Sequence, residues 1–167
     1  MHALYLLSVY VHILASMIWL GGALFLALVM VPLLRRMERP RAAALMRDAG
    51  TRFRAVGWVC FALLIVTGVV NLGYRGVTWG SFFSAEFHRS PFGRTTMWKL
   101  TLFVLVLIVS VFHDFVLGPR ATRIVEADPT GPAALRSRTI ASWVGRVNVL
   151  LGLGIVLLAV MLVRGSF

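Results

Sequence analysis

Hydrophobic and polar positions alternate in long blocks along the 167-residue chain. Four apolar runs are separated by polar segments that are rich in arginine. At a rise of about 1.5 Å per residue, roughly 20 residues cross the hydrocarbon layer of a bilayer. We predict helices at about residues 4–34, 55–74, 96–117 and 143–163. The pattern therefore predicts an all-α integral membrane protein, with residues 1–167 forming a single domain, a four-transmembrane-helix bundle.

The segments between the runs predict how the helices are connected. Residues Pro40 to Ala49 are expected to form a short helix on the membrane surface, where arginines meet anionic headgroups. Gly118 and Pro119 follow the third run and are expected to stop its helix. Because the connections are short, consecutive helices are expected to run antiparallel.

Arginine is distributed unevenly among the three connecting segments. The first holds seven, the third holds five when Arg146 at its boundary is included, and the middle segment, residues 75–94, holds three. Arginine and lysine accumulate in cytoplasmic loops. The first and third connections are therefore predicted to be cytoplasmic, with both termini and the aromatic middle segment outside.

Composition supports the membrane assignment and excludes other classes. The chain is 59% hydrophobic, with a mean hydropathy of +0.87 and a net charge of +11. In a soluble protein such a charge would suggest nucleic-acid binding. Here the arginines flank apolar runs, so no nucleic-acid partner is expected. The six carboxylates lie almost entirely in loops, which leaves few groups for acid–base catalysis.

Two histidines lie within the apolar runs, His12 in the first and His113 near the end of the third. An ionisable group in a transmembrane helix usually faces the protein interior and marks a ligand, a proton path or a partner. Counted along the helices, His12 lies about 12 Å below the outer end and His113 about 25 Å below it. This difference predicts two separate haem or metal sites instead of one haem held by both histidines. In the alternative structural interpretation, His113 caps its helix and Asp114 pairs with a loop arginine.

Four further residues are candidate cofactor contacts. Lys99, the sole lysine, either extends to the headgroups or is buried and holds a metal or a haem propionate. Gly21 and Gly22 remove side-chain bulk, so that a second helix or a flat cofactor can approach. Arg146 is expected, with Asn148, to pair with Asp114 or loop carbonyls, or to hold a propionate.

Copper has a separate set of candidate ligands on the outer side. Imidazoles suit copper, iron and zinc. Besides His12, the histidines His2 and His88 face outward in the predicted topology, and Met17 and Met97 add thioethers that favour reduced copper.

Three short motifs resemble a known family. They are H-x6-W-x-G-G from His12 to Gly22, W-K-L at residues 98–100, and F-H-D-F-x-L-G-P-R at residues 112–120. Together they resemble the small copper-resistance protein D family and the related HemJ-type protoporphyrinogen oxidases. The HemJ type usually has a histidine between the tryptophan and the lysine, whereas here Trp98 adjoins Lys99, which disfavours that oxidase activity.

The resemblance implies a multi-pass protein of the bacterial inner membrane, linked to copper uptake or to b-type haem. It matches His12, Lys99 and His113 to family positions. Three functional hypotheses follow. The protein binds haem b and transfers electrons, as a haem-dependent oxidoreductase or with a quinol or redox partner; it transports copper or confers copper resistance; or it is a non-catalytic accessory subunit. A homodimer is compatible with each.

Overall fold

The computed structural model describes residues 2–128 and 131–164, and these residues contain helices but no strands. Four stretches are long and apolar enough to cross a membrane: His2–Leu34, Arg39–Tyr74, Pro91–Val125 and Pro132–Arg164. The predicted fold class is confirmed. The second, third and fourth stretches are longer than the predicted runs because helical structure continues into the flanking basic segments, whereas the first only begins two residues earlier than predicted.

The first stretch contains α1 (His2–Phe25), the π-helical segment η1 (Leu26–Met30) and α2 (Val31–Leu34). A proline lacks a backbone N–H and its ring collides with the carbonyl four residues earlier. In η1 the backbone hydrogen bonds reach five residues back instead of four, and the Val31 N–H donates to the Leu26 carbonyl. The wider turn directly precedes Pro32, so the helix passes the proline without ending.

The second stretch is a single helix, α3 (Arg39–Tyr74). The separate surface helix predicted at Pro40 to Ala49 is wrong, since those residues form the beginning of α3. A helix of 36 residues is about 54 Å long, well beyond the roughly 30 Å of hydrocarbon. Its arginine-rich first turns therefore extend past the bilayer.

The middle segment folds into two short helices, α4 (Trp79–Phe82) and α5 (Ala85–Arg89). Each begins at a hydroxyl residue that caps it: Thr78 accepts from the Ser81 N–H, and Ser84 accepts from the Phe87 N–H. The aromatic rings of this segment contact one another, including Phe82 with Phe87 at 5.5 Å between centroids.

The third stretch contains α6 (Pro91–Phe112), the π-helical segment η2 (His113–Leu117) and α7 (Gly118–Ala127). The predicted stop at Gly118 and Pro119 is wrong. The Gly118 N–H donates to the His113 carbonyl, so a π turn again accommodates the proline and the helix continues. The fourth stretch is α8 (Pro132–Arg164).

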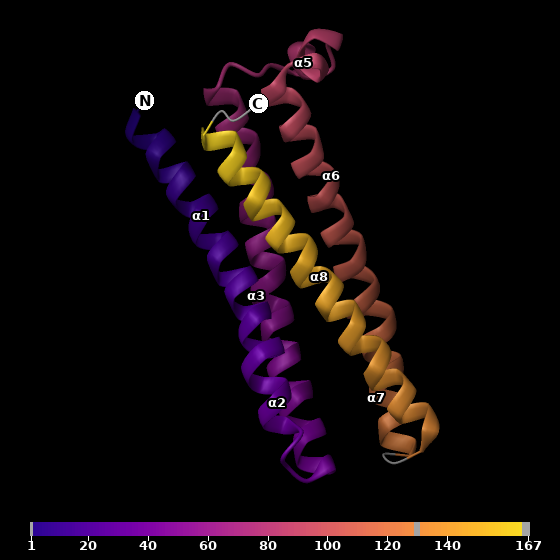
Figure 1. Cartoon of the computed structure of the whole chain (residues 1–167). Helices are drawn as coiled ribbons and strands as arrows, with labels where there is room; N and C mark the ends of the chain where they lie inside the picture. The colour runs from indigo at the N-terminus through magenta and orange to yellow at the C-terminus, as the bar shows by residue number, and fades with distance from the viewer. Residues whose placement is uncertain (1, 129–130, 165–167) are drawn as a thin grey trace.

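The helices pack as two pairs, α1 with α3 and α6 with α8, and α1 also contacts α8. In Figure 1 the start of α1 and the end of α8 lie at the same end of the molecule as α5, and α2 and α7 lie at the other end. The arrangement is thus antiparallel from one span to the next. The core is formed mainly by α1 and α3, where the rings of Trp19 and Phe61 lie 5.2 Å apart.

Glycine sets the contact between the pairs. A Cβ atom on Gly152 of α8 would lie 2.9 Å from Leu20 Cδ1 and 3.0 Å from Trp19 Cζ3. The absence of a side chain at Gly152 therefore lets α8 approach α1, as expected for small residues in membrane helices.

Candidate functional site

His12 lies on the face of α1 that packs against α3. Its Nδ1 is 2.7 Å from the Thr67 hydroxyl oxygen, and that hydroxyl donates to the Leu63 carbonyl at 2.6 Å. A hydroxyl has only one hydrogen to donate, so Nδ1 of His12 must be the donor to Thr67. The other ring nitrogen, Nε2, then carries the lone pair. His12 is thereby held in the tautomer that can ligate a metal through Nε2.

The ring of His12 also packs against Gly68 of α3. A Cβ atom on Gly68 would lie 3.6 Å from His12 Cε1, in van der Waals contact. Thr67 and Gly68 together place the imidazole between α1 and α3, away from lipid. Nearby, the Ser8 hydroxyl donates to the Thr67 carbonyl at 3.5 Å.

Polar groups continue from His12 toward the end of the bundle where α1 begins. On α3, Thr67, Asn71 and Arg75 are four residues apart and share one helix face. Asn71 Oδ1 is buried without a hydrogen-bond partner in the described part of the chain, as is Thr96 Oγ1 of α6.

Lys99 of α6 belongs to the same region. Its charge lies close enough to act on the His12 ring, and the charge of Arg75 acts on Lys99. Within residues 2–128 and 131–164 no carboxylate forms an ion pair with Lys99. The region between His12 and the end of the bundle where α1 begins is the outer region of the predicted topology. It is therefore a cationic site whose charge is not neutralised by the described protein groups.

His113 begins the π-helical segment η2. Its Nδ1 lies 3.1 Å from Asp114 Oδ1, and the other carboxylate oxygen of Asp114 accepts from Trp58 Nε1 at 3.1 Å. A carboxylate bonded to one ring nitrogen orients a histidine for ligation through the other. The His113 side chain is 40% exposed, so its ring is accessible at the bundle surface.

The expected partners of Asp114 differ from those observed. Arg54 reaches Asp114 at its backbone carbonyl, 3.4 Å away, and Trp58 binds the carboxylate. The predicted pairing of Arg146 and Asn148 with Asp114 is wrong. Asn148 donates to Ser110 Oγ at 3.0 Å, and the exposed Arg146 lies 4.9 Å from the ring centre of Trp143.

The two glycines of α1 have different surroundings. A Cβ atom on Gly22 would collide with the ring of Phe53, so a side chain of α3 fills this notch. A Cβ atom on Gly21 would meet nothing within 4 Å, and Gly21 is exposed. The sequence predicts that either a second helix or a flat cofactor approaches this pair. At Gly22 the neighbour is a second helix, α3.

The two histidines are held at different levels of α3. His12 bonds to Thr67, and Asp114 beside His113 bonds to Trp58, nine residues earlier. Nine residues of α-helix correspond to about 13 Å along the axis. This distance is much longer than a single haem allows between its two axial ligands, as the sequence predicts.

Sequence reasoning did not identify Thr67 or Trp58 as site residues. A hydroxyl or an indole inside an apolar run occurs widely in membrane helices, so neither residue is distinctive until the helices are paired. Within the described part of the chain, no group of three or more His, Cys, Asp or Glu residues could hold a metal ion. Met17 is 66% exposed. Its thioether, a candidate copper ligand, is therefore not buried beside His12.

These features define a multi-pass α-helical membrane protein with two oriented histidines inside its spans. A family model described as copper resistance protein D matches residues 47–162, more than half of the chain. The protein belongs to this family, which confirms the resemblance seen in the motifs. It is similar to an uncharacterized protein of Aquifex aeolicus (strain VF5), 29% identical over 155 residues that cover 92% of each chain. No solved structure matches the chain at a significant level.

Proposed function

We propose that this member of the copper resistance protein D family binds b-type haem in the bacterial inner membrane and transfers electrons. One observation carries the proposal: both membrane histidines have Nδ1 bonded to a neighbouring side chain, Thr67 or Asp114. Each ring is thereby oriented with Nε2 available as a ligand.

The number of ligands favours haem over a protein-bound metal ion. Each site offers one imidazole, and the described residues contain no cluster of three ligating side chains. A porphyrin supplies four nitrogens itself and needs only one or two axial ligands from the protein. His12 and His113 would ligate separate haems, or one of them would be the only axial ligand.

The charges of the outer region favour the same group. Lys99 and Arg75, whose charges act on each other, would attract carboxylates such as haem propionates. When bound, haem supplies one-electron chemistry. The chain orients the imidazoles through Thr67 and through Asp114 with Trp58. A quinol or a redox protein is the proposed electron partner, and a homodimer the proposed assembly.

Absorption spectroscopy tests the proposal. The protein purified after haem-supplemented expression should show a Soret band, and His12→Ala or His113→Ala should remove or shift it, depending on which ring is the ligand. His88→Ala is the matched control, because this histidine lies in α5 outside the bundle and should leave the spectrum unchanged. A colourless wild-type protein, or unchanged spectra in both membrane variants, would contradict haem binding.

The family supports copper transport as a second candidate. In this alternative His12 would be an entry ligand for reduced copper arriving from outside. The unneutralised charges of Lys99 and Arg75 would repel a copper cation at that entrance. Cellular copper uptake that falls in a His12→Ala strain, together with copper in the purified protein and no Soret band, would establish this alternative. Absence of both haem and copper would leave the accessory-subunit interpretation.

A further inference from the structure

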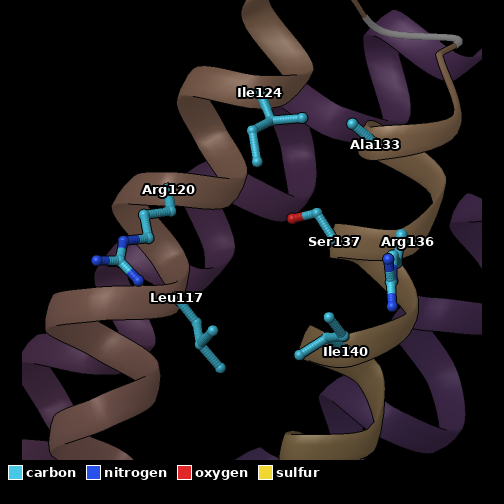
Figure 2. Close-up of a pocket in the computed structure, with 7 residues that line it drawn as sticks. All are labelled: Leu117, Arg120, Ile124, Ala133, Arg136, Ser137 and Ile140. Carbon is cyan, nitrogen blue, oxygen red and sulfur yellow. The ribbon is translucent and has the colours of Figure 1, made fainter.

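A cavity of about 260 Å³ lies between the end of the third span and the beginning of α8, and neither histidine is among its lining residues. Its lining includes Leu117, Arg120, Ile124, Arg136, Ser137 and Ile140. Figure 2 shows the side chains of Leu117, Ile124 and Ile140 in the gap between the two helices, with an arginine on each flank. We refer to it as the α7–α8 groove.

The groove combines apolar walls with unneutralised cations. Among the residues that the structure describes, no carboxylate forms an ion pair with Arg120 or Arg136. Both arginines are exposed, and Leu117, Ile124 and Ile140 form a continuous apolar surface between them. The matching ligand has an apolar chain and an anionic group near one end.

The groove also lies at the depth in the membrane where a lipid headgroup would be bound. Leu117 ends the apolar part of the third span, and the basic residues of α7 begin three residues later. The groove thus crosses the boundary between hydrocarbon and headgroups. It lies at the end of the bundle where arginine accumulates, which is the predicted cytoplasmic leaflet, and basic pockets between helices bind anionic headgroups there.

We propose that the α7–α8 groove binds an anionic glycerophospholipid, with an acyl chain along its apolar wall and the phosphate against Arg120 and Arg136. An acyl chain gains little by leaving bulk lipid for an equally apolar groove. Selectivity therefore comes from the arginines, whose guanidinium groups donate several hydrogen bonds to phosphate. A zwitterionic lipid presents the same phosphate with a cation beside it and binds less tightly.

The test compares phosphatidylglycerol with phosphatidylcholine in lipid titrations of the purified protein, followed by native mass spectrometry. The double variant R120Q/R136Q should lose roughly thirtyfold in phosphatidylglycerol affinity, since each arginine near anionic lipid contributes about fivefold. The control R89Q/R94Q removes the same charge at the opposite end of the bundle and should bind like the wild type.

A second variant checks the groove itself. Ser137→Phe places a large ring in the groove while retaining both arginines, and it should also weaken phosphatidylglycerol binding. The proposal is overturned if R120Q/R136Q and R89Q/R94Q lose affinity equally, or if the wild type binds both lipids equally. Because neither histidine contacts this groove, the haem spectrum should stay unchanged in all these variants. The result is therefore independent of the proposed function.

Discussion

At the scale of single residues, the ligating ability of His12 depends on the hydroxyl of Thr67, which lies 2.7 Å from its Nδ1. The apolar run identifies a histidine that lipid alone would not tolerate, and this was sufficient to choose His12. Which nitrogen is available depends on Thr67, whose own hydrogen is committed to the Leu63 carbonyl. Such a three-group chain exists only after α1 and α3 have paired, so it cannot be read from either helix alone.

Replacing Thr67 by valine tests this chain of hydrogen bonds. Valine has nearly the same shape but no hydroxyl, so the Nδ1–H of His12 would be buried without an acceptor, at a cost of about 1–3 kcal/mol. We expect a lower midpoint of thermal unfolding in detergent and a shifted Soret band if His12 ligates haem. Thr67→Ser retains the hydroxyl and should behave like the wild type. Equal behaviour of the valine and serine variants would show that Thr67 does not orient His12.

The Trp58–Asp114 contact makes a corresponding prediction for His113. Trp58→Phe removes the indole N–H that donates to Asp114 Oδ2, so the carboxylate becomes freer to rotate away from His113. We expect the spectral contribution of His113 to broaden or shift while that of His12 stays constant, measured by electron paramagnetic resonance of the oxidised protein. Trp143→Phe is the control, since Trp143 is 60% exposed and contacts Arg146 instead. Identical spectra for the two tryptophan variants would argue against an orienting role for Asp114.

At the scale of elements, hydropathy predicted the number and order of the spans but misplaced their ends. The extent of an apolar run shows which residues lie in the hydrocarbon layer, not where the helix ends. The helices continue into basic segments because arginine and alanine are good helix formers. The sequence predicts that Gly118 and Pro119 stop their helix, yet a π turn precedes both Pro32 and Pro119, at Leu26–Met30 and His113–Leu117. A change of hydrogen-bond register has no compositional signature, so the sequence could not reveal it.

The contact between α1 and α8 gives a prediction at this scale. Gly152→Ala would place a Cβ atom against the buried Trp19 and Leu20, and overpacking of this kind costs about 1–3 kcal/mol. Gly145→Ala lies on the same helix, and its Cβ atom would meet nothing within 4 Å. The two substitutions change helix propensity alike, so their difference in thermal midpoint reports packing alone. A Gly145 variant destabilised as much as the Gly152 variant would refute close packing as the role of Gly152.

At the scale of the whole molecule, the distribution of arginine predicts which end faces the cytoplasm. The two segments at the α2 and α7 end hold twelve arginines, whereas the α4–α5 segment holds three, and such asymmetry orients membrane proteins. The fold brings the basic segments together at one end (Figure 1), although they are distant in sequence. The predicted orientation would place His12 near the outer surface and the α7–α8 groove in the inner leaflet, so copper entry at His12 and the leaflet that supplies the proposed lipid depend on it.

Cysteine labelling tests this orientation. The single native cysteine, Cys60, is 3% exposed and should not react with a membrane-impermeant maleimide. Added individually, Gly80→Cys in α4 should be labelled in intact spheroplasts, and Ala127→Cys at the end of α7 only after the membrane is opened. Both positions are exposed, so a difference in labelling reports sidedness, not burial. The reverse labelling pattern would show that the bundle has the opposite orientation in the membrane. Lys99 and Arg75 would then face the cytoplasm, and copper could not enter from outside at His12. The groove would lie in the outer leaflet.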